Sequence, residues 1–73
     1  MSDYIVYVRE KDSGPLIVLG EVRGNTELEV ARAVADLIEE NELDRDSMIE
    51  IKGADGEPYC TPASVAECER KGA

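Results

Sequence analysis

The sequence predicts a single α+β domain over residues 1–73, with the element order ββαββα. Three patterns support this: two β-branched runs near the N-terminus, one long segment with helical periodicity, and a shorter strand pair followed by a second helix start. We expect an antiparallel or mixed sheet, with one long helix packed on one face and a short C-terminal helix. A chain of this size buries only about 60% of its unfolded surface, so the core must be thin.

The first two runs predict a hairpin. Tyr4–Arg9 is β-branched and aromatic with almost no polar interruption, which is typical of a strand covered on one face and partly on the other. Residues 10–15 are a polar loop that ends in a proline. The next run, Leu16–Arg23, alternates in the manner of a strand. The alternation places Leu16, Val18 and Val22 on one face and Glu21 and Arg23 on the other.

The long helix is predicted from its cap and its periodicity. Thr26 is suited to the N-cap and Glu29 to the third helical position, which is the pattern of a reciprocal capping box. We expect the helix to end near Asn41. Apolar residues recur at helical spacing and define one buried stripe: Val30, Val34, Leu37 and Ile38.

A second strand pair is predicted after a polar connection at 41–47. Residues 48–52 alternate cleanly, which places Ile49 and Ile51 inward. A turn at 53–56 leads to a short return strand, Glu57–Cys60, which its proline confines to a sheet edge.

The last segment predicts a short helix. Thr61 is suited to the N-cap and Pro62 to the first helical position, with Cys60 and Val65 as a hydrophobic staple. Cys68 would then lie two turns inside the helix, about 10 Å from Cys60 and beyond disulfide reach. We expect two reduced, structural thiols.

Acidic residues dominate the charge of this chain. The 17 acidic and 8 basic residues give a formal net charge of −9, which argues against direct binding to nucleic acid or to an anionic membrane. Residues 36–50 hold seven acidic residues and one basic one, Arg45, so this window alone contributes −6. The seven acidic residues are Asp36, Glu39, Glu40, Glu42, Asp44, Asp46 and Glu50.

Several of these carboxylates crowd the C-terminal end of the predicted helix, where the helix dipole disfavours anions. Two interpretations remain open. The acidic residues form a solvated face that keeps a small protein in solution, or they form a patch that binds a basic surface.

Motifs for catalysis and for cofactor or metal binding are weak. Histidine is absent, and no carboxylate pair lies in an apolar segment that would raise its pKa. Two cysteines cannot complete a zinc site, and Asp44-Arg45-Asp46 lacks the third ligand and the glycine of a calcium loop. We therefore expect no enzyme, no cofactor and no metal. A thiol-dependent enzyme or carrier centred on Cys60 is a minor alternative.

In size, charge and ββα organisation, the chain resembles the small acidic proteins of phages and mobile elements, in particular anti-CRISPR proteins that mimic DNA. The resemblance implies a non-catalytic inhibitor or decoy that occupies a basic, nucleic-acid-binding groove of a protein partner such as a CRISPR–Cas complex. The site residues would be the seven acidic residues of the 36–50 window.

The ββαβ pattern is also similar to ubiquitin-like β-grasp domains, which gives the alternative of a protein–protein interaction module that binds through its sheet. Carrier members of that group need a C-terminal Gly-Gly, whereas this chain has Lys71-Gly72-Ala73, so we expect no carrier chemistry. The first residues have neither the basic region nor the apolar run of a signal peptide. We expect a monomer or weak homodimer in the cytoplasm of a bacterial host cell.

Overall fold

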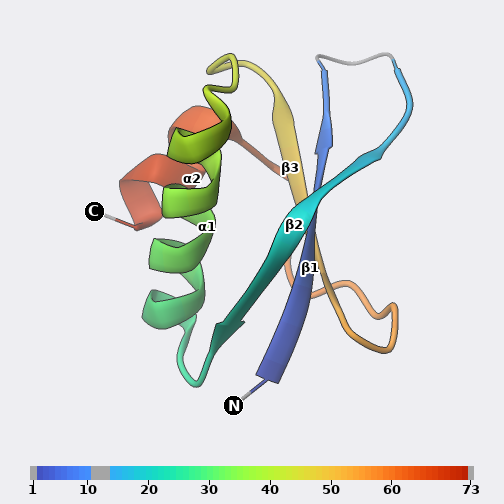
Figure 1. Cartoon of the computed structure of the whole chain (residues 1–73), viewed down its shortest axis with the longest axis vertical. Coiled ribbons are helices and arrows are strands. Elements are labelled where there is room, and N and C mark those ends of the chain that lie inside the picture. The colour runs from blue at the N-terminus through green and yellow to red at the C-terminus, as the bar shows by residue number, and fades with distance from the viewer. Residues whose placement is uncertain (1, 11–13, 73) are drawn as a thin grey trace.

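The elements follow the predicted order ββαββα in the computed structural model, which describes residues 2–10 and 14–72 (Figure 1). Part of the predicted 10–15 loop, residues 11–13, lies outside the described residues. The elements are β1 (Ser2–Arg9), β2 (Ile17–Gly24), α1 (Glu27–Asn41), β3 (Met48–Gly53), β4 (Ala63–Ser64) and α2 (Val65–Lys71).

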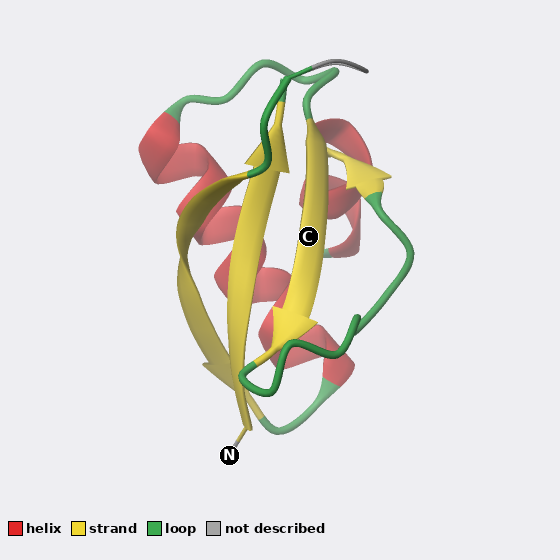
Figure 2. Ribbon diagram, turned by 90° about the vertical axis from the view of Figure 1, so that its right-hand side faces the viewer, coloured by secondary structure: helices red, strands yellow, loops and turns green. Residues whose placement is uncertain are grey.

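The strands form one sheet in the order β2-β1-β3-β4, and every pairing between them is antiparallel. Both helices lie on the same side of this sheet (Figure 1). Figure 2 shows the sheet in front of the helices, with its near face covered by no helix. The α+β class is therefore confirmed, and of the two predicted sheet types the antiparallel one is observed.

The core lies between this sheet and the two helices, and all six elements contribute to it. Its side chains are small and aliphatic, as the composition predicts, and the inward placement of Ile49 and Ile51 is confirmed. The buried apolar residues are Val6, Val8, Val22, Val30, Val34, Ile38, Ile49, Ile51, Ala63, Val65 and Cys68.

The predicted cap of α1 is confirmed. The backbone N–H of Glu29 donates to the Thr26 hydroxyl at 3.2 Å, and the Glu29 carboxylate in turn accepts from the N–H of Asn25 at 2.7 Å. The return bond thus reaches one residue further back than in the usual capping box. The helix ends at Asn41, as predicted.

A β-bulge in β2 overturns the prediction that Val18 faces the core. Val6 pairs with Gly20, but Tyr7 pairs with Val18, so Leu19 is an extra residue in β2. One extra residue reverses the alternation beyond it. Val18 therefore shares the outer face with Tyr7 and is 60% exposed, while Leu19 packs against the core.

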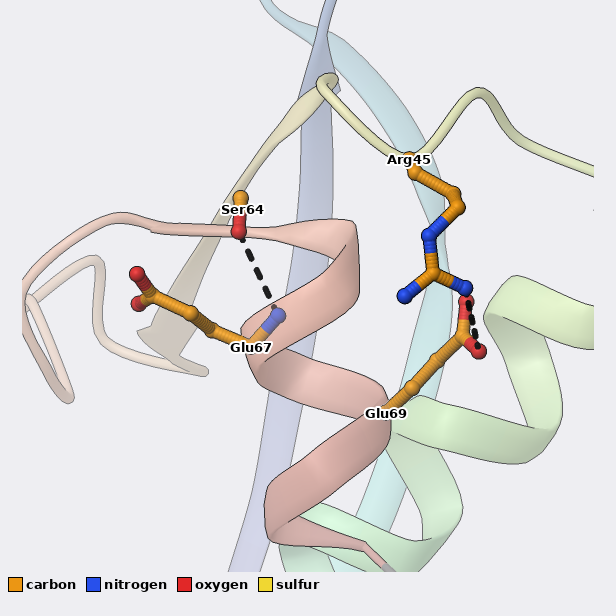
Figure 3. A network of polar contacts seen from close by, with 4 residues as sticks. All are labelled: Arg45, Ser64, Glu67 and Glu69. Atoms are coloured by element: carbon orange, nitrogen blue, oxygen red, sulfur yellow. Dashed lines mark hydrogen bonds and ion pairs between the residues drawn. The ribbon is translucent and has the colours of Figure 1, made fainter.

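The return strand and the cap of α2 also lie further along the chain than predicted. β4 is Ala63–Ser64, whereas Pro58 forms only an isolated bridge with Lys52. The N-cap is Ser64, whose hydroxyl accepts from the N–H of Glu67 at 3.2 Å (Figure 3). A serine followed three residues later by glutamate is a better capping pair than Thr61 offers.

This shift also removes the predicted hydrophobic staple. Cys60 is exposed and lies outside the turn that precedes α2. With Ser64 as the N-cap, the two staple positions belong to Ala63 and Cys68, and both residues are buried in the core.

Candidate interaction surface

The C-terminal half of α1 presents three carboxylates to solvent. Asp36, Glu39 and Glu40 are all exposed, whereas Val34 and Ile38 of the same helix are buried in the core. Side chains three and four positions apart on a helix share one face. The fold therefore places these three predicted site residues together, on the side of the helix that faces away from the core.

Glu42 adds a fourth carboxylate at the C-cap of α1. Its backbone has φ 49° and ψ 51°, the left-handed conformation that usually selects glycine. Its N–H donates to the carbonyl oxygen of Glu39 at 3.3 Å, and the Asn41 side chain donates to the carbonyl of Leu37 at 2.7 Å. The last turn contains no basic residue. The carbonyl oxygens at this helix end, which carries partial negative charge, therefore accept hydrogen bonds from these neutral donors and from no cation of that turn.

The segment after α1 extends the acidic region with Asp44 and Asp46, both exposed. Backbone hydrogen bonds attach this segment to the start of α2. The N–H of Ala66 donates to the carbonyl of Arg45 at 3.3 Å, and the N–H of Val65 donates to the carbonyl of Ser47 at 2.9 Å. These bonds fix the backbone that carries the two aspartates.

Arg45, the basic residue of the window, forms its ion pair with α2. Its Nη1 lies 4.0 Å from the Glu69 carboxylate (Figure 3). The two side chains are 74% and 43% exposed, and a pair as long and as hydrated as this contributes little to stability. This ion pair directs the Arg45 guanidinium towards α2, so it does not neutralise the carboxylates of α1.

Glu50 does not belong with the other predicted site residues. It lies on β3 opposite Tyr7, on the face of the sheet that points away from both helices. The structure therefore separates the predicted set into two parts. The larger part, termed here the acidic surface, consists of Asp36, Glu39, Glu40, Glu42, Asp44 and Asp46.

A cavity of about 500 Å³ lies on the other side of α1, between this helix, β3 and α2. Its wall is mainly aliphatic, with Tyr59, Cys60 and Cys68 among the lining residues and Glu27 and Lys71 as its charged groups. Sequence reasoning did not predict this cavity, because its residues come from four separate segments of the chain.

Both cysteines are free, as predicted. Desolvation raises the pKa of the Cys60 thiol; Lys71 offsets part of this effect, and the carboxylate of Glu27 adds a smaller increase. Burial likewise raises the pKa of Cys68. A reactive cysteine needs the opposite shift, so these environments favour two protonated, unreactive thiols.

Within residues 2–10 and 14–72, no three side chains of His, Cys, Asp or Glu are grouped closely enough to hold a metal ion. No helix in the same described part is long and apolar enough to cross a bilayer. No family model, curated protein or solved structure matches this chain.

Proposed function

We propose that this protein is a non-catalytic inhibitor or decoy, which uses the acidic surface to occupy a basic, nucleic-acid-binding groove of a protein partner. A CRISPR–Cas complex is one such partner, in the cytoplasm of a bacterial host cell. The observation that carries this proposal is the end of α1, where exposed carboxylates accumulate and basic residues are missing from the last turn.

The placement of these carboxylates opposes stability. Each anion near a helix C-terminus costs about 0.3–1 kcal/mol, and a non-glycine residue in the left-handed conformation adds a cost of about 1 kcal/mol. Surface carboxylates that only maintain solubility can lie anywhere on the protein. Their concentration at the least favourable position therefore supports selection for binding.

The spacing of the carboxylates also suits a groove built for a phosphate backbone. Residues one turn apart on α1 are separated by about 5.4 Å along the helix axis, so Asp36, Glu39 and Glu40 present a compact row of charge. Arginine and lysine side chains that hold phosphates can hold carboxylates through the same charge-assisted hydrogen bonds. Electrostatic steering would speed the encounter with such a groove.

Affinity capture from a bacterial lysate tests the proposal. Wild-type protein should retain nucleic-acid-binding proteins that are released by a competing DNA duplex. The variant Glu39→Lys/Glu40→Lys/Glu42→Lys should lose them, whereas Glu50→Lys, on the other face, should retain them. If the triple variant captures the same DNA-releasable proteins as wild type, the proposal is wrong.

The alternative function, a module that binds a partner through its sheet, is favoured by the exposure of Val18 beside Tyr7. Salt dependence separates the two functions. A complex made by the acidic surface should weaken steeply between about 0.05 and about 0.5 M NaCl, whereas an apolar sheet interface should not.

A further inference from the structure

The face of the sheet opposite the helices, termed here the open face, has an apolar centre. Along β1 the residues that point to this face include Ile5 and Tyr7, both only half-buried, and the neighbouring Val18 of β2 is 60% exposed. The register places Val18 directly beside Tyr7. The full open face consists of Asp3, Ile5, Tyr7, Arg9, Val18, Glu21, Arg23, Met48, Glu50, Lys52 and Ser64.

The open face is electrically neutral in a strongly acidic protein. It holds three acidic and three basic residues, so the net charge of −9 belongs entirely to the rest of the chain. Two copies that approach through other surfaces bring like charges together, and this repulsion opposes association. At the open face, which has no net charge, a second copy does not meet this repulsion. The six charged residues are Asp3, Glu21 and Glu50 with Arg9, Arg23 and Lys52.

The charges of the open face are also arranged to complement themselves. Lys52 lies beside Ile5, and Glu50 lies beside Tyr7, one step further along the same strands. A two-fold axis that runs across the strands, between the levels of Ile5 and Tyr7, reverses the strand direction of the second copy. It places Lys52 over Glu50 of the second copy, and Ile5 over its Tyr7.

The same axis acts on the ends of β1. Arg9 is three residues beyond the axis and Asp3 is three residues before it, so Arg9 of one copy faces Asp3 of the other, whose carboxylate also pairs with Arg23 of its own chain at 2.6 Å. On the edge strand β2 the axis places Glu21 opposite Val18 of the second copy, and the exposed carboxylate of Glu21 keeps access to water at this edge. Along β1 and β3 the residues of the open face thus meet complementary residues on an identical surface, as a two-fold dimer requires.

We propose that two copies of this chain associate through their open faces, as two packed sheets with Lys52 of each copy opposite Glu50 of the other. Aligned sheets pack about 10 Å apart, which allows the apolar side chains to meet at the centre and the long charged side chains to meet around them. This inference is independent of the acidic surface, which lies on the helical side of the molecule.

Sedimentation over about 10 μM to about 1 mM protein tests the dimer. Wild-type protein should move from 8.0 kDa towards twice that mass, and more readily at high salt, because salt screens the repulsion between two copies of charge −9. Val18→Glu should remain monomeric, because the axis places residue 18 opposite Glu21 of the second copy and the variant puts like charges there. Its matched control is Ile17→Glu, at a residue that is similarly exposed (56%) but pairs with Val8 and points to the other face, and this variant should still dimerise.

A charge exchange tests the arrangement itself. Lys52→Glu and Glu50→Lys should each weaken dimerisation about tenfold, because each places like charges opposite one another. The double variant Lys52→Glu/Glu50→Lys restores opposite charges and should return to within about threefold of wild type.

Three results would overturn the proposal. Wild-type protein that stays at 8.0 kDa at the highest concentration, at low and at high salt, assigns the open face to a different protein or to solvent. Equal loss of dimer in Ile17→Glu and Val18→Glu points to association through the edge of β2. A double variant as weak as the single ones rules out the Lys52–Glu50 pairing.

Discussion

The backbone N–H of Glu42 donates a hydrogen bond to the carbonyl oxygen of Glu39 at 3.3 Å, and this bond closes α1 with a glutamate in the left-handed conformation. The chain thereby combines a conformation that disfavours side chains with a charge that the helix dipole disfavours. The two costs have different physical origins, so they can be measured separately.

Replacement of Glu42 by glycine should raise the free energy of unfolding by about 1 kcal/mol. Glycine removes both the left-handed strain and the charge, although its greater freedom in the unfolded chain returns part of the gain. Urea unfolding measures the change. Glu42→Ala is the control, since it removes the charge and keeps the strain, and glycine should exceed it. Equal stability of the two variants would contradict the assignment of strain to this residue.

Charge reversal on α1 should stabilise the protein. Glu39→Lys and Glu40→Lys should each add about 0.3–1 kcal/mol at low ionic strength, since a cation near a helix C-terminus is favourable where an anion is not. The gain should fade in high salt. Glu27→Lys, in the first turn of the same helix, should change stability in the opposite direction. A loss of stability in the Glu39 and Glu40 variants would remove the argument that these residues oppose folding.

Gly72→Ala should lower stability by about 1–2 kcal/mol, because the end of α2 lies directly against α1. A Cβ atom on Gly72 would lie 2.7 Å from the carbonyl oxygen of Ala31 and 2.8 Å from the Cβ of Ala35. The φ of −88° suits any residue, so the cost is steric. Thermal unfolding measures it, with the exposed neighbour Arg70→Ala as the control. No difference between the two variants would show that the helices separate at little cost.

Stability should fall at alkaline pH through Cys68. Burial raises the pKa of this thiol above its ordinary value of 9.0, so the folded state holds its proton more tightly than the unfolded state. The resulting stabilisation is complete below pH 9 and is lost as the pH rises through the raised pKa. Cys68→Ala should therefore be less stable than wild type at neutral pH, by about 1 kcal/mol, and the difference should shrink above pH 9.

Urea unfolding of both proteins at several pH values gives this comparison. Cys60→Ala separates the contribution of the second thiol, whose pKa is also raised. Parallel stability curves for wild type and Cys68→Ala would show that the buried thiol does not titrate differently in the two states.

Local patterns predicted most of the fold correctly. The N-cap at Thr26, the end of α1 at Asn41 and the inward faces of Ile49 and Ile51 follow from periodicity and capping within a few residues. The bulge at Leu19 could not be predicted in this way, because it depends on how β2 aligns with β1. The start of α2 depends equally on a distant residue, since Ser47 accepts the N–H of Val65.

The candidate site was partly predictable for the same reason. Helical spacing correctly grouped Asp36, Glu39 and Glu40 on one exposed face. Distance along the chain groups Glu50 with them, although the alternation that turns Ile49 and Ile51 inward also turns Glu50 outward. The open face itself could not be predicted, because its neutral charge results from the pairing of three strands.

Displacement of DNA from a captured partner tests the central claim most directly. The measurement is the fluorescence anisotropy of a labelled duplex bound to that partner, as the protein is added. The account predicts that wild-type protein and Glu50→Lys release the duplex, and that Glu39→Lys/Glu40→Lys/Glu42→Lys does not. Binding of wild-type protein to the partner while the duplex stays bound would contradict occupation of the groove.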